Sequence, residues 1–323
     1  MAVEPHDSSM TKRLLVLALK VIALTIILTI CFMVAVSVSG MSALAGETPS
    51  PADATVALLW LVASCFIQAV VLTCIILRSR WTGWKLVGAV FVAFFGLNTV
   101  LMQIETMFFL TEKVPPGLAQ KGFVMGAITS ALFAPLAALI LGKMRRGIAP
   151  AEPNRRLVMP PGSWAWKLVV IAAAYVILYF TFGYFVAWRN PAVLAYYGGT
   201  DPGSFLAQIA HVWNTTPGLF AFQVFRAILW TAFALPVIRM LKGRPWETGL
   251  MVGLLFAMGS SQLLLPNPFM PEAVARVHLV ETATSNFLFG VLVGWLPALP
   301  CSSTRQSLQQ SGASHAAAVA DPS

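Results

Sequence analysis

The stretch "LLVLALKVIALTIILTICFMVAVSV", residues 14–38, is 25 residues long and contains a single charged side chain, Lys20. An α-helix needs ~20 apolar residues to cross a hydrocarbon layer ~30 Å thick. Further blocks of this kind recur along the chain, bounded by charged residues, Pro and Gly. These blocks decide the fold, because only helices that cross a lipid bilayer account for so many of them.

The composition leads to the same fold class. Apolar residues make up 58% of the chain and charged residues 10%, whereas soluble domains contain roughly 45–50% and ~25%. A soluble fold could not bury this apolar fraction, so the lipid bilayer is the expected partner. The net charge of +9 is explained below by membrane orientation, and no nucleic acid is expected to bind.

We predict an all-α integral membrane protein, a polytopic bundle of about eight transmembrane helices with no separate soluble domain. Residues 12–300 form this single domain, between disordered cytoplasmic tails at 1–11 and 301–323. Cleavage of a signal peptide after Ala45 would leave seven helices, but the apolar stretch before it is much longer than the ~7–15 residues of a signal sequence. The predicted spans are 14–38, 54–77, 84–110, 122–142, 166–187, 217–238, 248–265 and 273–298.

The positions of the basic residues predict the orientation. With the N-terminus inside, 15 of the 21 Lys and Arg lie in the inside segments, four in the outside segments and two within spans. An excess of Lys and Arg in cytoplasmic loops is the usual rule. We therefore predict that both termini are cytoplasmic. The compact loops suggest a bacterial inner (plasma) membrane.

The longest outside connection, 188–216, contains a predicted short helix near 203–213. Asp201 could cap its N-terminus with Pro202 at the first helical position. Phe205, Ile209 and Val212 fall on one apolar stripe. This pattern is typical of a helix that lies on the outer membrane interface.

Four ionisable residues lie at similar depths in the outer half of the predicted bundle. At ~1.5 Å of rise per residue, Glu105, Arg226, His278 and Glu281 are about 8, 13, 10 and 15 Å from the outer surface. A charged side chain that faces lipid costs at least ~2.5–3.5 kcal/mol at a helix centre. We expect the four side chains to turn inward and to form one cluster.

Other polar residues accompany this cluster. His278, Glu281 and Ser285 share one helical face, and Asn286 lies at its edge. Gly290 and Gly294 form a GxxxG ridge on the same span, and Gly249 and Gly253 form another on the preceding span, which indicates close helix packing. The candidate ligand-binding residues are Arg226, Gln223, Asn98, Asn286, Ser285 and Gln262.

Three interpretations of the cluster are open at this stage. A polar cavity could bind or transport a small solute or ion, although no pair of interrupted helices, frequent in secondary transporters, is evident. Alternatively, His278, Glu281 and Glu105 could be the catalytic groups of an intramembrane enzyme, either as acid and base or as ligands of a divalent metal. Finally, the ion pairs could serve only to fix helix packing.

No sequence motif selects among the three. The chain has neither the paired serine-protease motif nor HExxH, and it lacks both a Walker motif and the EExxxR of membrane-embedded proteases. Haem is not expected, because His278 is the one histidine within a predicted span. Four scattered cysteines without a CxxC pair indicate neither zinc nor disulfides.

Overall fold

The computed structural model describes residues 6–44, 50–145, 156–201 and 203–299. These residues are 81% helical and include no β-strand. Seven helices are long and apolar enough to cross a membrane, which confirms an all-α, multi-pass membrane protein. The elements are α1 (His6–Ser39), η1 (Met41–Leu44), α2 (Pro51–Leu77), α3 (Gly83–Phe95), η2 (Gly96–Val100), α4 (Leu101–Phe109), α5 (Leu118–Ile140), α6 (Pro161–Phe182), η3 (Gly183–Ala187), α7 (Pro191–Tyr197), α8 (Phe205–Thr215), α9 (Gly218–Met240), α10 (Pro245–Ala257), η4 (Met258–Leu264) and α11 (Glu272–Trp295).

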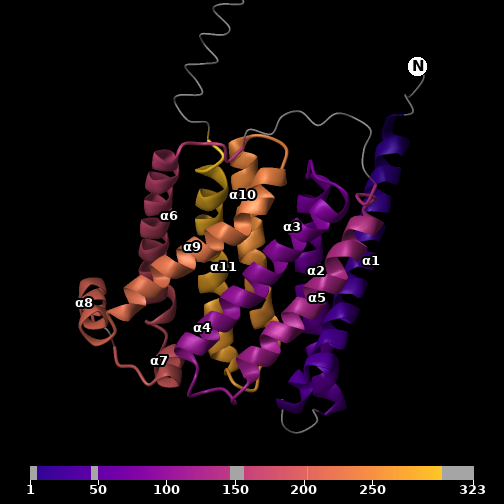
Figure 1. Ribbon diagram of the computed structural model, residues 1–323. Coiled ribbons are helices and arrows are strands. Elements are labelled where there is room, and N and C mark those ends of the chain that lie inside the picture. Colours follow the sequence, from indigo (N-terminus) through magenta and orange to yellow (C-terminus); the bar gives the residue numbers. More distant parts are fainter. Residues whose placement is uncertain (1–5, 45–49, 146–155, 202, 300–323) are drawn as a thin grey trace, which may run out of the picture.

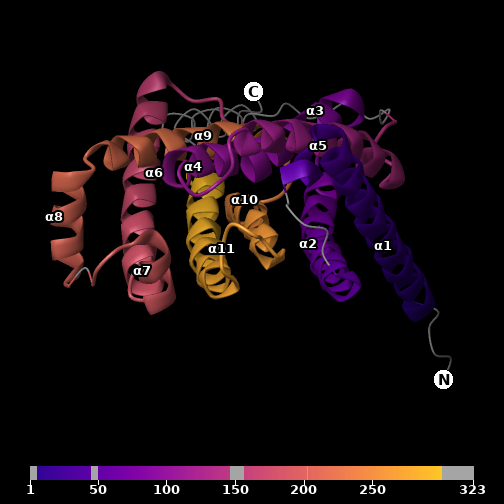
Figure 2. The ribbon, with the colours of Figure 1, turned by 90° about the horizontal axis from the view of Figure 1, so that it is seen from below.

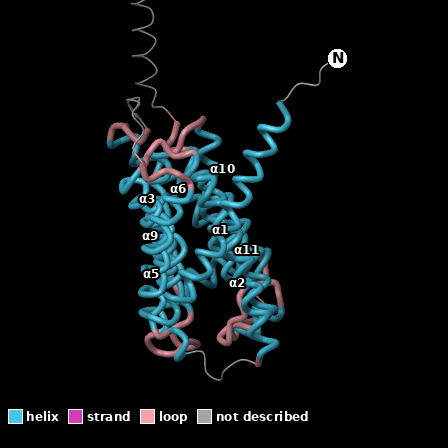
Figure 3. The backbone as a smooth tube through the Cα atoms, turned by 90° about the vertical axis from the view of Figure 1, so that its right-hand side faces the viewer, coloured by secondary structure: helices cyan, strands magenta, loops and turns pink. Residues whose placement is uncertain are grey.

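The helices form two layers (Figures 1 and 3). One layer contains α9, α3 and α5, and the other contains α1, α2, α10 and α11. At one edge α1 packs against α5, and at the opposite edge α6 contacts both α9 and α11. The two layers are thereby joined at both edges.

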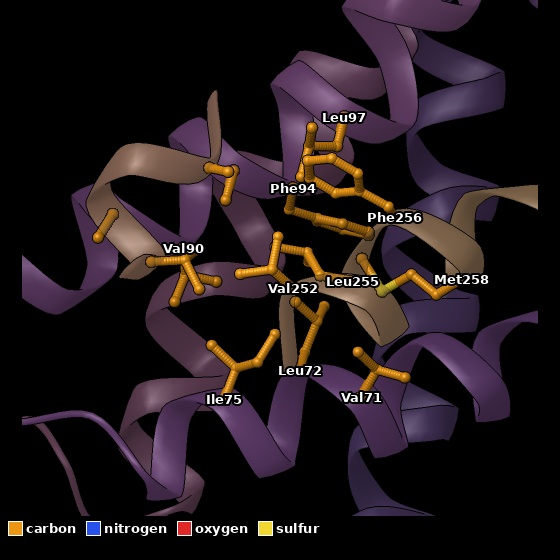
Figure 4. Packing of buried hydrophobic residues seen from close by; sticks show 14 of the residues in the cluster. Val71, Leu72, Ile75, Val90, Phe94, Leu97, Val252, Leu255, Phe256 and Met258 are labelled. Carbon is orange, nitrogen blue, oxygen red and sulfur yellow. The ribbon is translucent and has the colours of Figure 1, made fainter. Parts of the chain in front are cut away.

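The core lies where α2, α3 and α10 meet between the layers (Figure 4). Leu72 and Ile75 of α2, Phe94 of α3 and Phe256 of α10 are almost completely buried there. Large apolar side chains also cover the outward faces, as expected for a surface in contact with lipid tails. Examples that are at least 60% exposed are Leu15, Leu59, Leu139, Val169 and Ile177.

The most extensive contact between two helices is that of α10 with α11, and glycines make their approach possible. A Cβ atom on Gly290 would lie 2.6 Å from the Val252 carbonyl oxygen, and one on Gly294 would lie 2.7 Å from that of Thr248. A Cβ on Gly253 would likewise lie 2.9 Å from the Phe287 carbonyl oxygen. The predicted glycine ridges are confirmed, and the two ridges face each other.

One end of the bundle gathers most of the basic loops, and we call it the basic end. Its loops are joined by an isolated bridge between Ser79 and Leu241. Lys143 Nζ donates to the Ser79 carbonyl (3.1 Å), and Arg156 Nη1 donates to Thr248 Oγ1 (2.7 Å). Burial lowers the pKa of Lys143 and of Arg156, and neighbouring cations add to both effects. We call the opposite end, with loops 110–117 and 265–271, the distal end.

The seventh predicted span, 248–265, is divided in the structure. α10 ends at Ala257 after 13 residues, and the chain continues as the seven-residue 3-10 helix η4. At ~1.5 Å per α-helical residue and ~2.0 Å per 3-10 residue, the two segments together extend about 33 Å. This length suffices to cross a hydrocarbon layer, although no single helix here does so.

Two local predictions are corrected by the structure. Residues 6–11, expected in a disordered tail, belong to α1, because each residue added to an existing helix gains a hydrogen bond. The cap of α8 is Ser204, whose hydroxyl accepts from Ala207 N, whereas Asp201 accepts from Gly203 N before the helix begins. Residues 1–5, Pro202 and the tail 301–323 lie outside the described residues.

The helix predicted near 203–213 is present as α8, at the margin of the bundle beyond α6 (Figure 2). Its predicted stripe of Phe205, Ile209 and Val212 is half-buried. The Phe205 ring packs against Tyr184 of η3, with ring centroids 5.5 Å apart. The apolar stripe therefore attaches α8 to the end of the α6–η3 span.

Candidate functional site

A cavity of about 170 Å³ lies in the distal half of the bundle, between α4, α6, α9, η4 and α11. Glu105, Arg226, His278 and Glu281, which the sequence predicts to meet, all line it. We call it the charged cavity. The predicted convergence of the four side chains is confirmed, whereas a function for them stays a prediction.

Arg226 and Glu105 form an ion pair across the cavity wall. Arg226 Nη2 of α9 donates to Glu105 Oε2 of α4 at 2.8 Å, and Nη1 donates to Gln223 Oε1 at 3.0 Å. The guanidinium also lies 5.7 Å from the ring centroids of Tyr175 and Phe222. Arg226 is 4% exposed and Glu105 is 31% exposed. The carboxylate is therefore the more accessible member of the pair.

Two buried donors beside this pair have no acceptor among the described residues. They are Arg226 Nε and Gln223 Nε2. The two residues are three positions apart on α9 and therefore lie on one helical face. A buried donor without an acceptor costs about 1–3 kcal/mol. Arg226, which lines the cavity, thus carries a hydrogen-bond donor that the protein itself does not use.

A second polar group lies on α11. His278 Nδ1 is 2.7 Å from Glu281 Oε2, and His278 Nε2 is 3.3 Å from the hydroxyl of Tyr197 in α7. Thr282 Oγ1 donates to Ser260 Oγ of η4 at 3.0 Å. The imidazole is thereby held between a carboxylate and a phenol, an arrangement suited to moving a proton.

Three helices lose their α geometry beside the charged cavity. η2 and η3 are π-helical, and η4 is a 3-10 helix. Each segment contributes to the cavity lining, through Leu97, Gly183 and Ser260 respectively. Irregular backbone at membrane depth is tolerated where it is buried in protein or lines a cavity, and it is frequent at functional sites.

Two spans change their helical geometry. η2 is a π-helical segment within the continuous helix Gly83–Phe109, whereas η4 continues α10 as a 3-10 helix. The two segments contact each other, since Gln262 Nε2 donates to the Asn98 carbonyl at 3.2 Å. Neither segment contains a proline, which is why the change of geometry is not evident in the sequence.

The predicted ligand-binding residues are divided between two cavities. Ser285 and Asn286 line the charged cavity with Arg226, and Gln223 supports Arg226 from behind. Asn98 and Gln262 instead line a cavity of about 150 Å³ between α1, α2, η2 and α5.

The reason for this division is the π-helical segment. In a regular α-helix, residues seven positions apart, such as Asn98 and Glu105, lie on the same face. A π-helix contains more residues per turn, so the same spacing no longer places them on one face. Asn98 is therefore turned away from the face that carries Glu105.

The predicted metal ligands are not assembled into one site. Among the described residues, no group of three or more His, Cys, Asp or Glu side chains is placed to hold a metal ion. Glu105 pairs with Arg226, whereas His278 and Glu281 pair with each other. The two pairs therefore line the same cavity, but they do not come together around one position for a metal ion.

Several aromatic residues of the charged cavity were not predicted. Tyr175, Tyr179 and Tyr197 line it. Tyr175 and Tyr179 are four residues apart, which places two hydroxyls on one face of an otherwise apolar span. This spacing can be read from the sequence and could have indicated both residues. Tyr197 reaches His278 only because residues 188–201 fold back against α11, which no local pattern indicates.

The charged cavity therefore combines an ion pair, a His–Glu pair, unused donors and aromatic rings at membrane depth. Protein-family models, curated proteins and solved structures were all compared with the chain, and none of the three comparisons finds a match. The function must be argued from the residues of this cavity in a multi-pass membrane protein.

Proposed function

We propose that the charged cavity binds a small polar solute with an anionic or carbonyl oxygen and that the protein transports this solute across the membrane. The observation that carries the proposal is the unused Nε of Arg226, a buried donor on a residue that lines the cavity. An oxygen of the solute would accept from this nitrogen. Because Arg226 already neutralises Glu105, the solute need not carry a full negative charge.

The size of the cavity limits the solute. A single water needs ~10–15 Å³ of such volume, whereas sites for drug-sized ligands measure ~300–1,000 Å³. A cavity of about 170 Å³ suits a molecule of the size of an amino acid or a short carboxylate. Tyr175 and Tyr179 would contact its apolar part, and Glu281 could accept from a donor or an ammonium group.

The π-helical and 3-10 segments favour transport over simple binding. Discontinuous helices near the bilayer midplane commonly form the substrate sites of secondary transporters, and α10 ends beside the charged cavity, where the chain continues as η4. The π-helical segments η2 and η3 also supply residues to the lining of this cavity. Their hydrogen-bonding pattern can change at lower cost than that of a regular helix, which would allow the cavity wall to open.

The proposed orientation places both termini and the basic end in the cytoplasm, with eight membrane crossings if α10 and η4 together form one. Fifteen of the 21 Lys and Arg support it. The charged cavity then lies in the outer half of the membrane and would receive its solute from outside the cell. A bacterial inner membrane is the proposed location.

A second candidate function is intramembrane acid–base catalysis. The chain from Glu281 through His278 to Tyr197 favours it, because a carboxylate orients the imidazole and the phenol could accept or donate a proton. In this case the bound molecule would leave the cavity chemically changed.

Ligand screening of purified protein tests the proposal. Free L-amino acids, short mono- and dicarboxylates and short amines are added singly, and the thermal midpoint is measured. A ligand at about 100 times its Kd stabilises the fold by about 2.7 kcal/mol. Arg226→Lys should abolish the shift, because Lys retains the charge but lacks the Nε–H of the guanidinium. Arg276→Lys is the matched control, since Arg276 is exposed and pairs with Glu272 outside the cavity.

The compound that binds is then offered to proteoliposomes. Accumulation of unchanged compound supports transport, and recovery of a modified compound that requires His278 supports catalysis. If no compound shifts the wild type, or if Arg226→Lys responds as the wild type does, the ion pairs serve only to hold the helices together.

A further inference from the structure

The second cavity, which we call the neutral cavity, contains an unexplained polar network. It lies between α1, α2, η2 and α5, measures about 150 Å³ and also reaches η4. None of the described residues that line it is Asp, Glu, His, Lys or Arg. The residues that supply oxygen atoms to its wall include Ser64, Asn98, Thr99, Gln103, Thr129 and Ser130.

The hydrogen bonds in this wall can be assigned one proton at a time. The Ser261 hydroxyl donates to the Met258 carbonyl at 2.7 Å, so its oxygen can only accept from Ser64, which lies 2.8 Å away. Ser64 therefore donates to Ser261, and its own oxygen is also left to accept. Both hydroxyl oxygens then accept from Gln68 Nε2, at 3.0 and 3.2 Å.

This assignment also fixes the orientation of the side-chain amides of Gln68 and Asn98. Because Gln68 presents its nitrogen to the serines, its Oε1 faces Asn98 and accepts from Asn98 Nδ2 at 2.9 Å. Asn98 must then direct Oδ1 away from the network. That oxygen is buried and has no partner among the described residues, and the residue is 6% exposed. The free end of the network is therefore an acceptor.

The polarity of the network makes this acceptor stronger. Every donor in the sequence Asn98, Gln68, Ser64 and Ser261 points away from Asn98 Oδ1, and aligned hydrogen bonds polarise one another. The oxygen faces Gly259, a residue that lines the charged cavity, and a Cβ atom there would lie 3.0 Å from Asn98 Oδ1. Any other residue at position 259 would fill the space next to the oxygen.

We propose that the neutral cavity binds a small monovalent cation, with Asn98 Oδ1 as a ligand. A polarised, buried oxygen in a cavity lined by further hydroxyl and amide oxygens suits a hard cation. Divalent cations are disfavoured, because calcium and magnesium sites in proteins rely on carboxylates and this wall has none among the described residues. An anion is disfavoured by the unpaired, partially negative oxygen of the Asn98 amide.

The position of η4 connects this cation site to the charged cavity. Ser261 of η4 holds the network of the neutral cavity, whereas Ser260 lines the charged cavity. Cation binding would therefore change the affinity for the solute, and by linkage the solute would change the affinity for the cation by the same factor. This coupling rests on the proposed function, whereas the cation site itself does not.

Binding of radiolabelled sodium to the purified protein tests the cation site, in the absence of any solute and with N-methyl-D-glucamine as the replacement cation. We expect saturable binding at one site per chain. Asn98→Ala should weaken it by at least about 10- to 100-fold, since even a residue that only supports a ligand contributes this much to metal affinity. Asn214→Ala, an exposed Asn of α8, is the control and should bind as the wild type does.

Gly259→Ala is a second test, which does not break the hydrogen-bond network. Its methyl group would occupy the space next to Asn98 Oδ1, so sodium affinity should fall also in this variant. Absence of saturable sodium binding to the wild type, or unchanged binding in both variants, would overturn the cation site. Solute binding that persists in N-methyl-D-glucamine without any sodium binding would overturn the cation site alone. Saturable sodium binding by a protein that binds none of the tested solutes would contradict only the proposed function.

Discussion

Arg226 is almost fully buried, and its two terminal nitrogens are used by Glu105 and Gln223. The Coulomb attraction within such a pair roughly equals the cost of removing both charges from water. The intact pair therefore adds little net stability. Loss of one partner is a different case, because the remaining charge stays buried without compensation.

We predict that Glu105→Gln lowers the free energy of unfolding by about 3 kcal/mol. This value is at the lower end of the ~3–5 kcal/mol range for broken buried pairs, because Glu105 is 31% exposed. The double variant Glu105→Gln/Arg226→Leu should be more stable than Glu105→Gln alone. Unfolding in mixed micelles measures both, and a double variant that is less stable would show that Arg226 has a stabilising role independent of Glu105.

The serines of the neutral cavity allow a second prediction at this scale. Ser261→Ala removes the acceptor of Ser64 and one acceptor of Gln68. A buried donor without a partner costs about 1–3 kcal/mol, and we expect a loss of that size in the same unfolding assay. Ser37→Ala removes an exposed hydroxyl from α1 and should change stability little. Equal effects of both substitutions would contradict the proton assignment of the network.

Individual residues show what the sequence could predict. The depth of Glu105, Arg226, His278 and Glu281 follows from simple helical arithmetic, and the cost of charge in lipid then requires them to converge. The same arithmetic failed for Asn98, because it assumes regular α-helix between Asn98 and Glu105. One extra residue per helical turn hardly changes the depth of a residue in the membrane. It does change the direction in which the side chain points.

At the scale of elements, the contact between α10 and α11 depends on glycine. In a membrane no hydrophobic effect holds helices together, so close van der Waals packing must do so. The GxxxG spacing in α11 and the matching spacing in α10 are visible in the sequence. They predicted close helix packing, whereas the pairing of α10 with α11 comes from the structure. The π-helical and 3-10 segments were not predictable, because tertiary hydrogen bonds such as Gln262 to Asn98 stabilise them.

We predict that Gly290→Ala destabilises the bundle by about 1–3 kcal/mol, the usual cost of overpacking. Its Cβ would lie 2.6 Å from the Val252 carbonyl oxygen and 2.8 Å from the Gly253 Cα, so the two helices must separate. Gly88→Ala in α3 is the control, because no atom lies within 4 Å of its added Cβ. That substitution should be neutral or slightly stabilising, since Ala favours helix over Gly by about 1 kcal/mol. Destabilisation of both variants by the same amount would argue against backbone contact as the cause.

At the scale of the whole molecule, the distribution of charge predicts how the bundle sits in the membrane. The loops of the basic end carry Arg78, Lys143, Arg156, Lys242 and Arg244. The loops of the distal end carry few basic residues. The fold itself does not depend on this asymmetry, so orientation must be measured separately.

Labelling of single cysteines measures both the orientation and the number of crossings. After replacement of the native cysteines, Glu112→Cys and Asn267→Cys in the distal loops should react with a membrane-impermeant thiol reagent added to intact cells. Arg244→Cys at the start of α10 should react only after permeabilisation. If Arg244→Cys and Asn267→Cys react from the same side, α10 and η4 do not cross the membrane and the predicted count of eight crossings is wrong.

The 3-10 geometry of η4 has a consequence for the length of the chain. A 3-10 helix rises ~0.5 Å more per residue than an α-helix, so rewinding its seven residues into α-helix would shorten this segment by about 3.5 Å. Such a change would draw loop 265–271 toward the bundle and rotate Ser260 and Ser261 away from their present partners. Because 3-10 runs longer than 3–4 residues are uncommon, the contacts of both cavities act together to keep η4 at its extended length.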